Sequence, residues 1–174
     1  MRKFSDGYSL IEVMVAVLIL SLGLAGMGLL QVINVKNTYN ANNRSVAATY
    51  AKYMTEQMRA NVEAYELGHF VNATTGSANS CVGSAANCTP QQLAQDDLSR
   101  WQNQLGALLP GGEGIICVDG SDGATDDGVP GAPACSGNGQ TVVKIFWRET
   151  ANAGGDGGSD IDNEWQAYGL TVYP

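Results

Sequence analysis

The sequence is poor in charge and in histidine, and its helix-breaking residues are unevenly spread. Only 15% of the residues are charged, and His69 is the single histidine. No proline occurs before Pro90 and no glycine within residues 30–67, whereas glycines crowd residues 106–169. Because proline and glycine interrupt helices, this distribution predicts a helical first third followed by a loop-rich remainder.

Basic residues are also few. Nine Lys and Arg against 17 Asp and Glu give a net charge of −8. Phosphate binding needs a basic face, so this balance argues against nucleic acid as a partner. An ordinary solvated acidic surface accounts for the charge.

Motifs of common enzymes are missing from the chain. It contains no phosphate-binding loop, no G-x-S-x-G elbow and no H-E-x-x-H helix. With one histidine, most acid–base arrangements lack a residue, and nothing places the carboxylates of residues 119–127 in a cleft. The sequence therefore predicts a protein that is not an enzyme and needs no cofactor.

Cysteines are few but even in number, and all of them follow the long apolar run described next. They are Cys81, Cys88, Cys117 and Cys135. This count favours two disulfides in an oxidising compartment. Zinc is the alternative, but no C-x2-C pair is present. Four cysteines allow three connectivities. The preferred pairs are Cys81–Cys88, which closes a small ring, and Cys117–Cys135.

Residues 13–30 form an apolar run without a charged side chain. Its length is at the short end for a membrane span, and apolar neighbours extend it on both sides. Arg2 and Lys3 precede it, so the positive-inside rule predicts a cytoplasmic N-terminus. A cleaved secretory signal is the alternative, but the run is long for one and no A-x-A site follows it. A plain signal anchor, which is not cleaved, is the better alternative.

Glu12 does not fit a plain anchor. It lies at the N-terminal edge of the apolar stretch, between Ile11 and Val13. A carboxylate inside a membrane costs on the order of 2–3 kcal/mol on insertion scales. Its position near the interface reduces this cost, but the surroundings still favour a positively charged partner.

The segment at residues 7–13, GYSLIEV, resembles the processing site of type IV prepilins and pseudopilins. The resemblance implies that a membrane peptidase removes residues 1–7 by cutting after Gly7 and that Tyr8 becomes the N-methylated first residue. It also implies that Glu12 pairs with the amino terminus of a neighbouring subunit, which would fix the axial register between helices. Tyr8 departs from the usual Phe but keeps the aromatic ring.

Residues 22–31, 53–61 and 101–112 further resemble the PilV branch of minor pilins. This implies a single pass through the inner membrane, with residues 8–34 forming the transmembrane and filament-core half of a helix. Residues 35–174 would form the amphipathic half and a periplasmic domain that ends on the pilus or cell surface. The implied partners are other major and minor pilins, the prepilin peptidase, the inner-membrane assembly machinery and, before assembly, membrane lipid.

The helix is expected to continue beyond the membrane over residues 8–66 and to stop at Gly68. Apolar residues recur at helical spacing on one face of this second half, which predicts that it packs on its own domain. They are Val46, Ala47, Tyr50, Ala51, Met54, Met58, Val62 and Tyr65.

A second, shorter helix is predicted to start at Thr89 as N-cap, with Pro90 in the first turn and Gln92 completing a capping box. Its apolar face comprises Leu98, Trp101, Leu105 and Leu108, and residues 110–112 end it. Trp101 is expected in the core.

Three strands are expected at residues 114–118, 141–148 and 165–173. Together the elements predict a pilin-like α+β fold, in which the long helix packs on a small antiparallel sheet beside the second helix and disulfide-bonded loops.

Acidic residues cluster in two glycine-rich loops. Asp119 and Asp122 lie in the first, and Asp160 and Asp162 in the second. These are weak candidates for calcium ligands, because the spacing is not that of an EF-hand and flexible solvated loops explain the acidic residues better. No metal is therefore predicted.

Three functions remain open at this stage. The first is a minor pilin that assembles or initiates a type IV pilus, with consequences for twitching motility. The second is a minor pseudopilin of type II secretion, built on the same leader and helix. The third is a pilus-tip adhesin or calcium-dependent binding module that uses the loop at residues 119–140 for cell adhesion.

Overall fold

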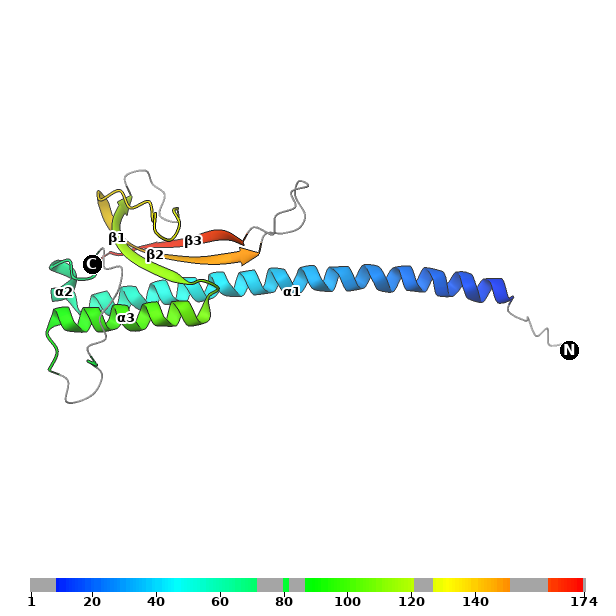
Figure 1. Ribbon diagram of the computed structural model, residues 1–174, viewed down its shortest axis with the longest axis horizontal. Coiled ribbons are helices and arrows are strands. Elements are labelled where there is room, and N and C mark those ends of the chain that lie inside the picture. Colours follow the sequence, from blue (N-terminus) through cyan, green and yellow to red (C-terminus); the bar gives the residue numbers. More distant parts are fainter. Residues whose placement is uncertain (1–8, 72–79, 82–86, 121–126, 151–162, 174) are drawn as a thin grey trace. The chain divides into compact units, whose positions relative to one another are not determined.

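The chain forms helices first and a sheet afterwards. The computed structural model describes residues 9–71, 80–81, 87–120, 127–150 and 163–173 (Figure 1). The elements are α1 (Leu10–Ala60), α2 (Val62–Glu66), α3 (Pro90–Leu108), β1 (Glu113–Gly120), β2 (Gly139–Thr150) and β3 (Asn163–Thr171). The predicted α+β class is confirmed, as are the three strands, with slightly different bounds.

Contacts along the chain divide it into two compact units, Met1–Ala41 and Asn42–Pro174. Helix α1 contributes its first part to one unit and its last part to the other. In the described part of the first unit, every residue after Ser9 is helical. All other elements belong to the second unit.

The prediction of one unbroken helix to residue 66 is wrong, because α1 ends at Ala60. Asn61 leaves the helical conformation, with φ −121° and ψ 62°, and caps α2. Its Oδ1 accepts from the backbone N–H of Ala64 at 3.4 Å, and its Nδ2 donates to the carbonyl oxygen of Pro90 at 2.8 Å. A contact with a residue far along the chain therefore stabilises the break.

Gly68 ends the helical region, as predicted. Its φ of +73° is left-handed, a conformation that glycine adopts without strain. The N–H of Gly68 donates to Tyr65, and the N–H of His69 donates to Ala64 at 2.9 Å. These two bonds form the Schellman motif, which satisfies carbonyls that the end of α2 would otherwise leave open.

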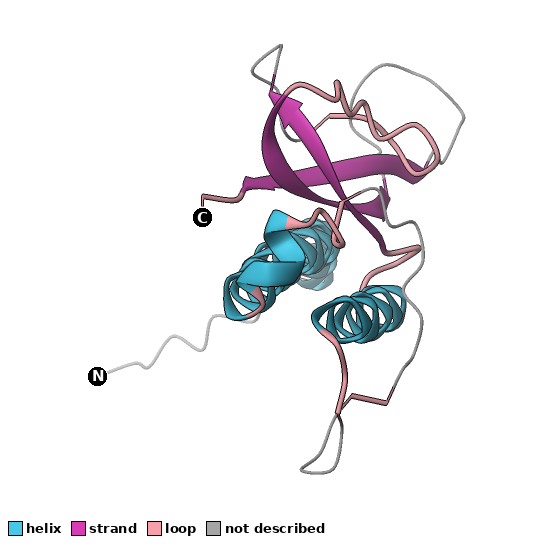
Figure 2. Cartoon of the chain, turned by 90° about the vertical axis from the view of Figure 1, so that its left-hand side faces the viewer, coloured by secondary structure: helices cyan, strands magenta, loops and turns pink. Residues whose placement is uncertain are grey.

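The sheet is an antiparallel meander in the order β1-β2-β3. Alternation along β2 sends Val143, Ile145 and Trp147 toward the helices, as predicted from their spacing. Figure 2 shows α3 and the C-terminal part of α1 on the same side of the sheet. The core lies between these two helices and the sheet. Its helical members are Ala47, Ala51, Met54, Met58, Ala64, Ala94, Leu98, Trp101 and Leu105.

Two residues predicted for these apolar faces are exposed instead. Val62 is 53% exposed, because the break at Asn61 changes the direction of the chain before α2 begins. Leu108 is 50% exposed at the end of α3. Leu109 takes its place in the core, because it has left the helix with an extended backbone.

Trp101 lies in the core, as predicted. It is fully buried, and its indole Nε1 donates to the carbonyl oxygen of Tyr50 at 3.0 Å. Strand β1 approaches this ring so closely at Gly114 that an added Cβ would collide with it. The helix that carries Trp101 starts with the predicted capping box, in which Thr89 and Gln92 exchange hydrogen bonds.

An ion pair ties the last part of α1 to β2. The Arg44 guanidinium donates to both carboxylate oxygens of Glu149, at 3.2 and 3.3 Å. Glu149 is only 7% exposed and also accepts from the Trp147 indole at 3.0 Å. The three side chains form one connected polar group beside the core.

Disulfides join Cys81 to Cys88 and Cys117 to Cys135. These are the pairings preferred from the sequence. With all four cysteines in disulfides, none is left to bind zinc as a thiolate.

Candidate functional site

The first part of α1 presents apolar side chains to its surroundings rather than to a core. From Leu10 to Val35, the large apolar side chains that the structure describes are between 46% and 77% exposed. Burying one such side chain contributes roughly 1.5–3 kcal/mol. A surface of this kind is stable only when lipid or another protein covers it.

This part of α1 is also long and apolar enough to cross a membrane, judged by length and composition. Its most apolar window has a mean hydropathy of 2.5, and none of that window is buried inside the protein. A helix from a soluble core would be mostly buried. A signal sequence would pass the same test, but the apolar run is longer than is usual for one and continues into the domain helix.

Glu12 is the only charged residue in the described part of the chain before Lys36. It lies in the first turn of α1, and its side chain is exposed. Its backbone N–H donates to the carbonyl oxygen of Ser9 at 2.9 Å. Within the described residues its carboxylate has no ion-pair partner, so an external cation could reach it.

The position of Glu12 also fits a role within its own helix. Ser9 and Glu12 have the S-x-x-E spacing of a capping box, in which a glutamate accepts from the N-cap backbone. A carboxylate in the first turn also interacts favourably with the helix dipole. Capping and pairing with a neighbour are compatible, and they predict different effects of substitution.

Gly7 and Tyr8, the predicted cleavage site and mature N-terminus, lie outside the described residues.

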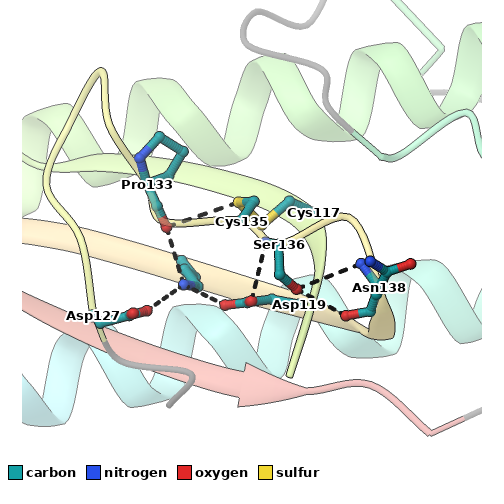
Figure 3. The surroundings of a disulfide bond; sticks show 8 residues. Cys117, Asp119, Asp127, Pro133, Cys135, Ser136 and Asn138 are labelled. Carbon is teal, nitrogen blue, oxygen red and sulfur yellow. Dashed lines mark hydrogen bonds and ion pairs between the residues drawn. A yellow bond between two sulfur atoms is a disulfide. The ribbon is translucent and has the colours of Figure 1, made fainter. Parts of the chain in front are cut away.

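A second polar group lies on the sheet face that points away from the helices. Lys144 of β2 is fully buried, and its Nζ lies 2.6 Å from Oδ2 of Asp119 and 2.6 Å from Oδ1 of Asp127. It also donates to the carbonyl oxygen of Pro133 at 3.0 Å. Figure 3 shows these partners beside the disulfide of Cys117 and Cys135.

The pKa values in this group follow from its pairing. Burial would raise the pKa of Asp119, but pairing with Lys144 and hydrogen bonds from Gly120 and Ser136 outweigh it and lower the pKa to about 2. Burial would lower the pKa of Lys144, but Asp119 and Asp127 outweigh it and raise that pKa. The Asp119 carboxylate and the Lys144 ammonium are therefore both charged at neutral pH.

This pairing bears on the calcium candidates. Asp119 is engaged with an ammonium group and is not free to act as a ligand. Asp122, Asp160 and Asp162 lie outside the described residues. Within the part of the chain that the structure describes, no three His, Cys, Asp or Glu side chains come together as a metal site would require.

Lys144 was missed as a special residue at the level of sequence. The available signal was its place as the one charge in the segment VVKIFW, residues 142–147, whose neighbours are apolar on both faces of the strand. A strand that is apolar on both faces is covered on both faces, so its lysine has to find a buried partner.

Comparison with known proteins agrees with the geometry of the first helix. A family model of the prokaryotic N-terminal methylation motif matches residues 2–28. A second model, described as type IV pilin Tt1218, matches residues 29–99. No curated protein and no solved structure matches the chain significantly.

The two matches adjoin one another and cover the apolar part of α1, its amphipathic part and the start of α3. A methylation motif of this kind implies processing by a prepilin peptidase and assembly with other pilins. Pilins are structural subunits rather than enzymes. Residues 2–28 therefore match the N-terminal methylation motif of prepilins, and residues 29–99 match a type IV pilin domain.

Proposed function

We propose that the protein is a minor pilin of the PilV type, which takes part in assembling or initiating a type IV pilus. Residues 1–7 would be its leader, 8–34 the half of the helix that moves from membrane to filament, and 35–174 the amphipathic half and periplasmic domain. The observation that carries the proposal is the exposed apolar helix with a single carboxylate in its first turn.

The mechanism is assembly without a chemical step. In the membrane, lipid covers the apolar side chains of residues 10–35. In the filament, neighbouring helices cover the same side chains. Since both surroundings are apolar, moving the helix from lipid into the filament gains little from the hydrophobic effect. Specific contacts therefore decide whether a subunit enters the filament and in which register.

Glu12 would supply such a contact by pairing with the methylated amino group of Tyr8 in an adjacent subunit. Burying a charge without a partner is strongly unfavourable, so the pair would disfavour every register that separates the two groups. The pairing is charge-dependent, whereas the capping role of Glu12 needs only an acceptor oxygen.

Substitutions at Ser9 and Glu12 separate these roles. Glu12→Gln keeps a side chain able to cap α1 but removes its charge, and we expect incorporation into sheared pili to fall at least about tenfold. Ser9→Ala removes the capping hydroxyl and keeps the carboxylate, so incorporation should stay within about twofold. Immunoblots of the pilus and membrane fractions provide the measurement.

Leader removal serves as the internal control, because both variants should still be cut to mature size. If Glu12→Gln is incorporated like the unaltered protein, the register role is wrong. If Ser9→Ala loses incorporation while Glu12→Gln keeps it, helix capping explains the effect instead.

Gene deletion separates pilus from secretion functions. If the protein is a minor pilin, deletion of its gene should reduce the number of surface pili without stopping enzyme secretion. Loss of secreted enzymes with normal piliation would indicate a type II pseudopilin. Loss of adhesion alone, with pili intact after removal of residues 121–133, would favour the adhesin.

A further inference from the structure

The outer face of the sheet carries a charged group that the proposed assembly role does not use. Lys144 lies at the middle of the central strand, and alternation places Val142 and Phe146 on the same face. All three side chains are at most 2% exposed. A segment outside the sheet must therefore cover them, since the helices pack on the other face.

The cover is the segment of residues 127–136. Two of the three partners of the Lys144 ammonium, Asp127 and Pro133, belong to it, at 2.6 and 3.0 Å. Its tip is a tight turn in which the backbones of Val129 and Ala132 exchange hydrogen bonds of 3.1 and 2.9 Å. We call residues 127–136 the cover segment.

Besides the contacts of Asp127 and Pro133 with Lys144, the cover segment is anchored near Cys135. Its C-terminal end is held by the Cys117–Cys135 disulfide and by the N–H of Ser136, which donates to Asp119 at 3.2 Å. A turn of this size has no core of its own and is not stable without attachment. The disulfide, which links residues 18 apart in the sequence, keeps the segment near the strand when the weaker contacts open.

Hydration of the exposed charges would offset part of the loss when the segment opens. The closed state holds an ammonium and a carboxylate away from water, and such pairs recover their desolvation cost only while their geometry is intact. Once the segment lifts, water solvates Lys144, Asp119 and Asp127. The closed state therefore depends on a constraint that limits how far the segment can move.

We infer that the Cys117–Cys135 disulfide is a redox-dependent latch, which keeps the cover segment closed over Lys144 and the apolar side chains beside it. Oxidation of the two thiols closes the face, and reduction opens it while the helix–sheet core stays folded. A subunit that has not yet been oxidised would then show an amine and an apolar patch that the mature subunit conceals.

The reduction step is ordinary thiol–disulfide exchange. A dithiol reductant supplies two electrons and two protons, its own sulfurs form a cyclic disulfide, and Cys117 and Cys135 become thiols. No other bond changes. The structural effect comes from the lost constraint alone.

Lysine acylation tests the latch on the full-length mature protein in detergent. After residue 8 the chain has three lysines, Lys36, Lys52 and Lys144, and Lys52 is exposed on α1. The probe is an N-hydroxysuccinimide ester of acetate, and peptide mass spectrometry gives each rate. In the oxidised protein Lys144 should react at least about a hundredfold more slowly than Lys52, because the amine reacts only after local opening.

Removing the disulfide should release that protection. In the double variant Cys117→Ser with Cys135→Ser, the rate for Lys144 should come within about tenfold of Lys52. The matched control is Cys81→Ser with Cys88→Ser, which removes the other disulfide and should leave Lys144 protected. Dithiol treatment of the unaltered protein should reproduce the first result.

Fluorescence of the buried Trp101 and Trp147 reports on the core in every sample. The latch is overturned if Lys144 stays protected without the Cys117–Cys135 disulfide, or if it is as reactive as Lys52 while oxidised. It is also overturned if the tryptophan signal shows that the whole domain unfolds, because the disulfide would then hold the core together rather than a local cover.

Discussion

Among single residues, the lysine on the central strand imposes the tightest electrostatic requirement in the described domain. Its ammonium has two carboxylates within 2.6 Å and is fully removed from solvent. Breaking a buried pair by removing one partner is far more costly than breaking a surface pair. Stability should therefore depend on the protonation of Asp119.

The folded pKa of Asp119, about 2, lies below its ordinary value of 3.8. The stabilisation is thus complete above pH 4–5 and is lost as the pH falls from about 4 toward 2. We expect Asp119→Asn to lower the urea midpoint at pH 6 and to flatten the decrease in that midpoint between pH 5 and 2. Tryptophan fluorescence during urea unfolding measures both.

Glu66→Gln serves as the control for this pH dependence, because Glu66 is exposed on α2. It should leave the acid profile close to that of the unaltered protein. An Asp119→Asn protein with the same steep decrease would show that another carboxylate is responsible.

Among the structural elements, the junction between α1 and α2 depends on one side chain. Asn61 caps α2 and also binds the start of α3 through Pro90. Asn61→Ala removes both bonds, and we expect a loss of about 1–2 kcal/mol in the free energy of unfolding. Urea denaturation followed by circular dichroism gives the value.

Asn61→Asp tests the two bonds separately. An aspartate can still accept from Ala64 but cannot donate to Pro90, so its stability should lie between those of the other two proteins. Equal stability of Asn61→Ala and the unaltered protein would mean that the break has another origin.

Sequence patterns predicted elements whose causes are local. The capping box of α3, the stop at Gly68 and the alternation of β2 depend on neighbours within a few residues, and each was predicted. The break at Asn61 was missed because its partner, the carbonyl of Pro90, lies far along the chain. The pairing of Lys144 was missed because it depends on how the loop before β2 folds back over that strand.

For the molecule as a whole, the family resemblance was easier to predict from the sequence than the packing was. The predicted leader, the apolar run and Glu12 are contiguous in the sequence, and the methylation-motif model matches residues 2–28. The exposed faces that tertiary structure creates, such as those of Val62 and Leu108, have no comparable local signal. The exposure of Val62 and Leu108 depends on where the helices end, which composition does not predict well.

Processing is the test that belongs to the whole molecule. Gly7→Val places a branched side chain at the predicted cleavage site, and we expect the leader to remain attached. An immunoblot should show a slightly larger band confined to the membrane, because an uncut subunit lacks the free amino group at Tyr8. A mature-sized band would contradict the assigned site.

The bidentate contact of Arg44 with Glu149 has a practical consequence for producing a water-soluble fragment. A fragment that begins after residue 44 would leave a carboxylate that is 7% exposed without its cation. A fragment that begins near residue 36 would retain the Arg44 guanidinium and still omit the exposed apolar part of α1, which requires detergent. The shortest stable fragment should therefore start before Arg44, even though the sheet and α3 lie much later in the chain.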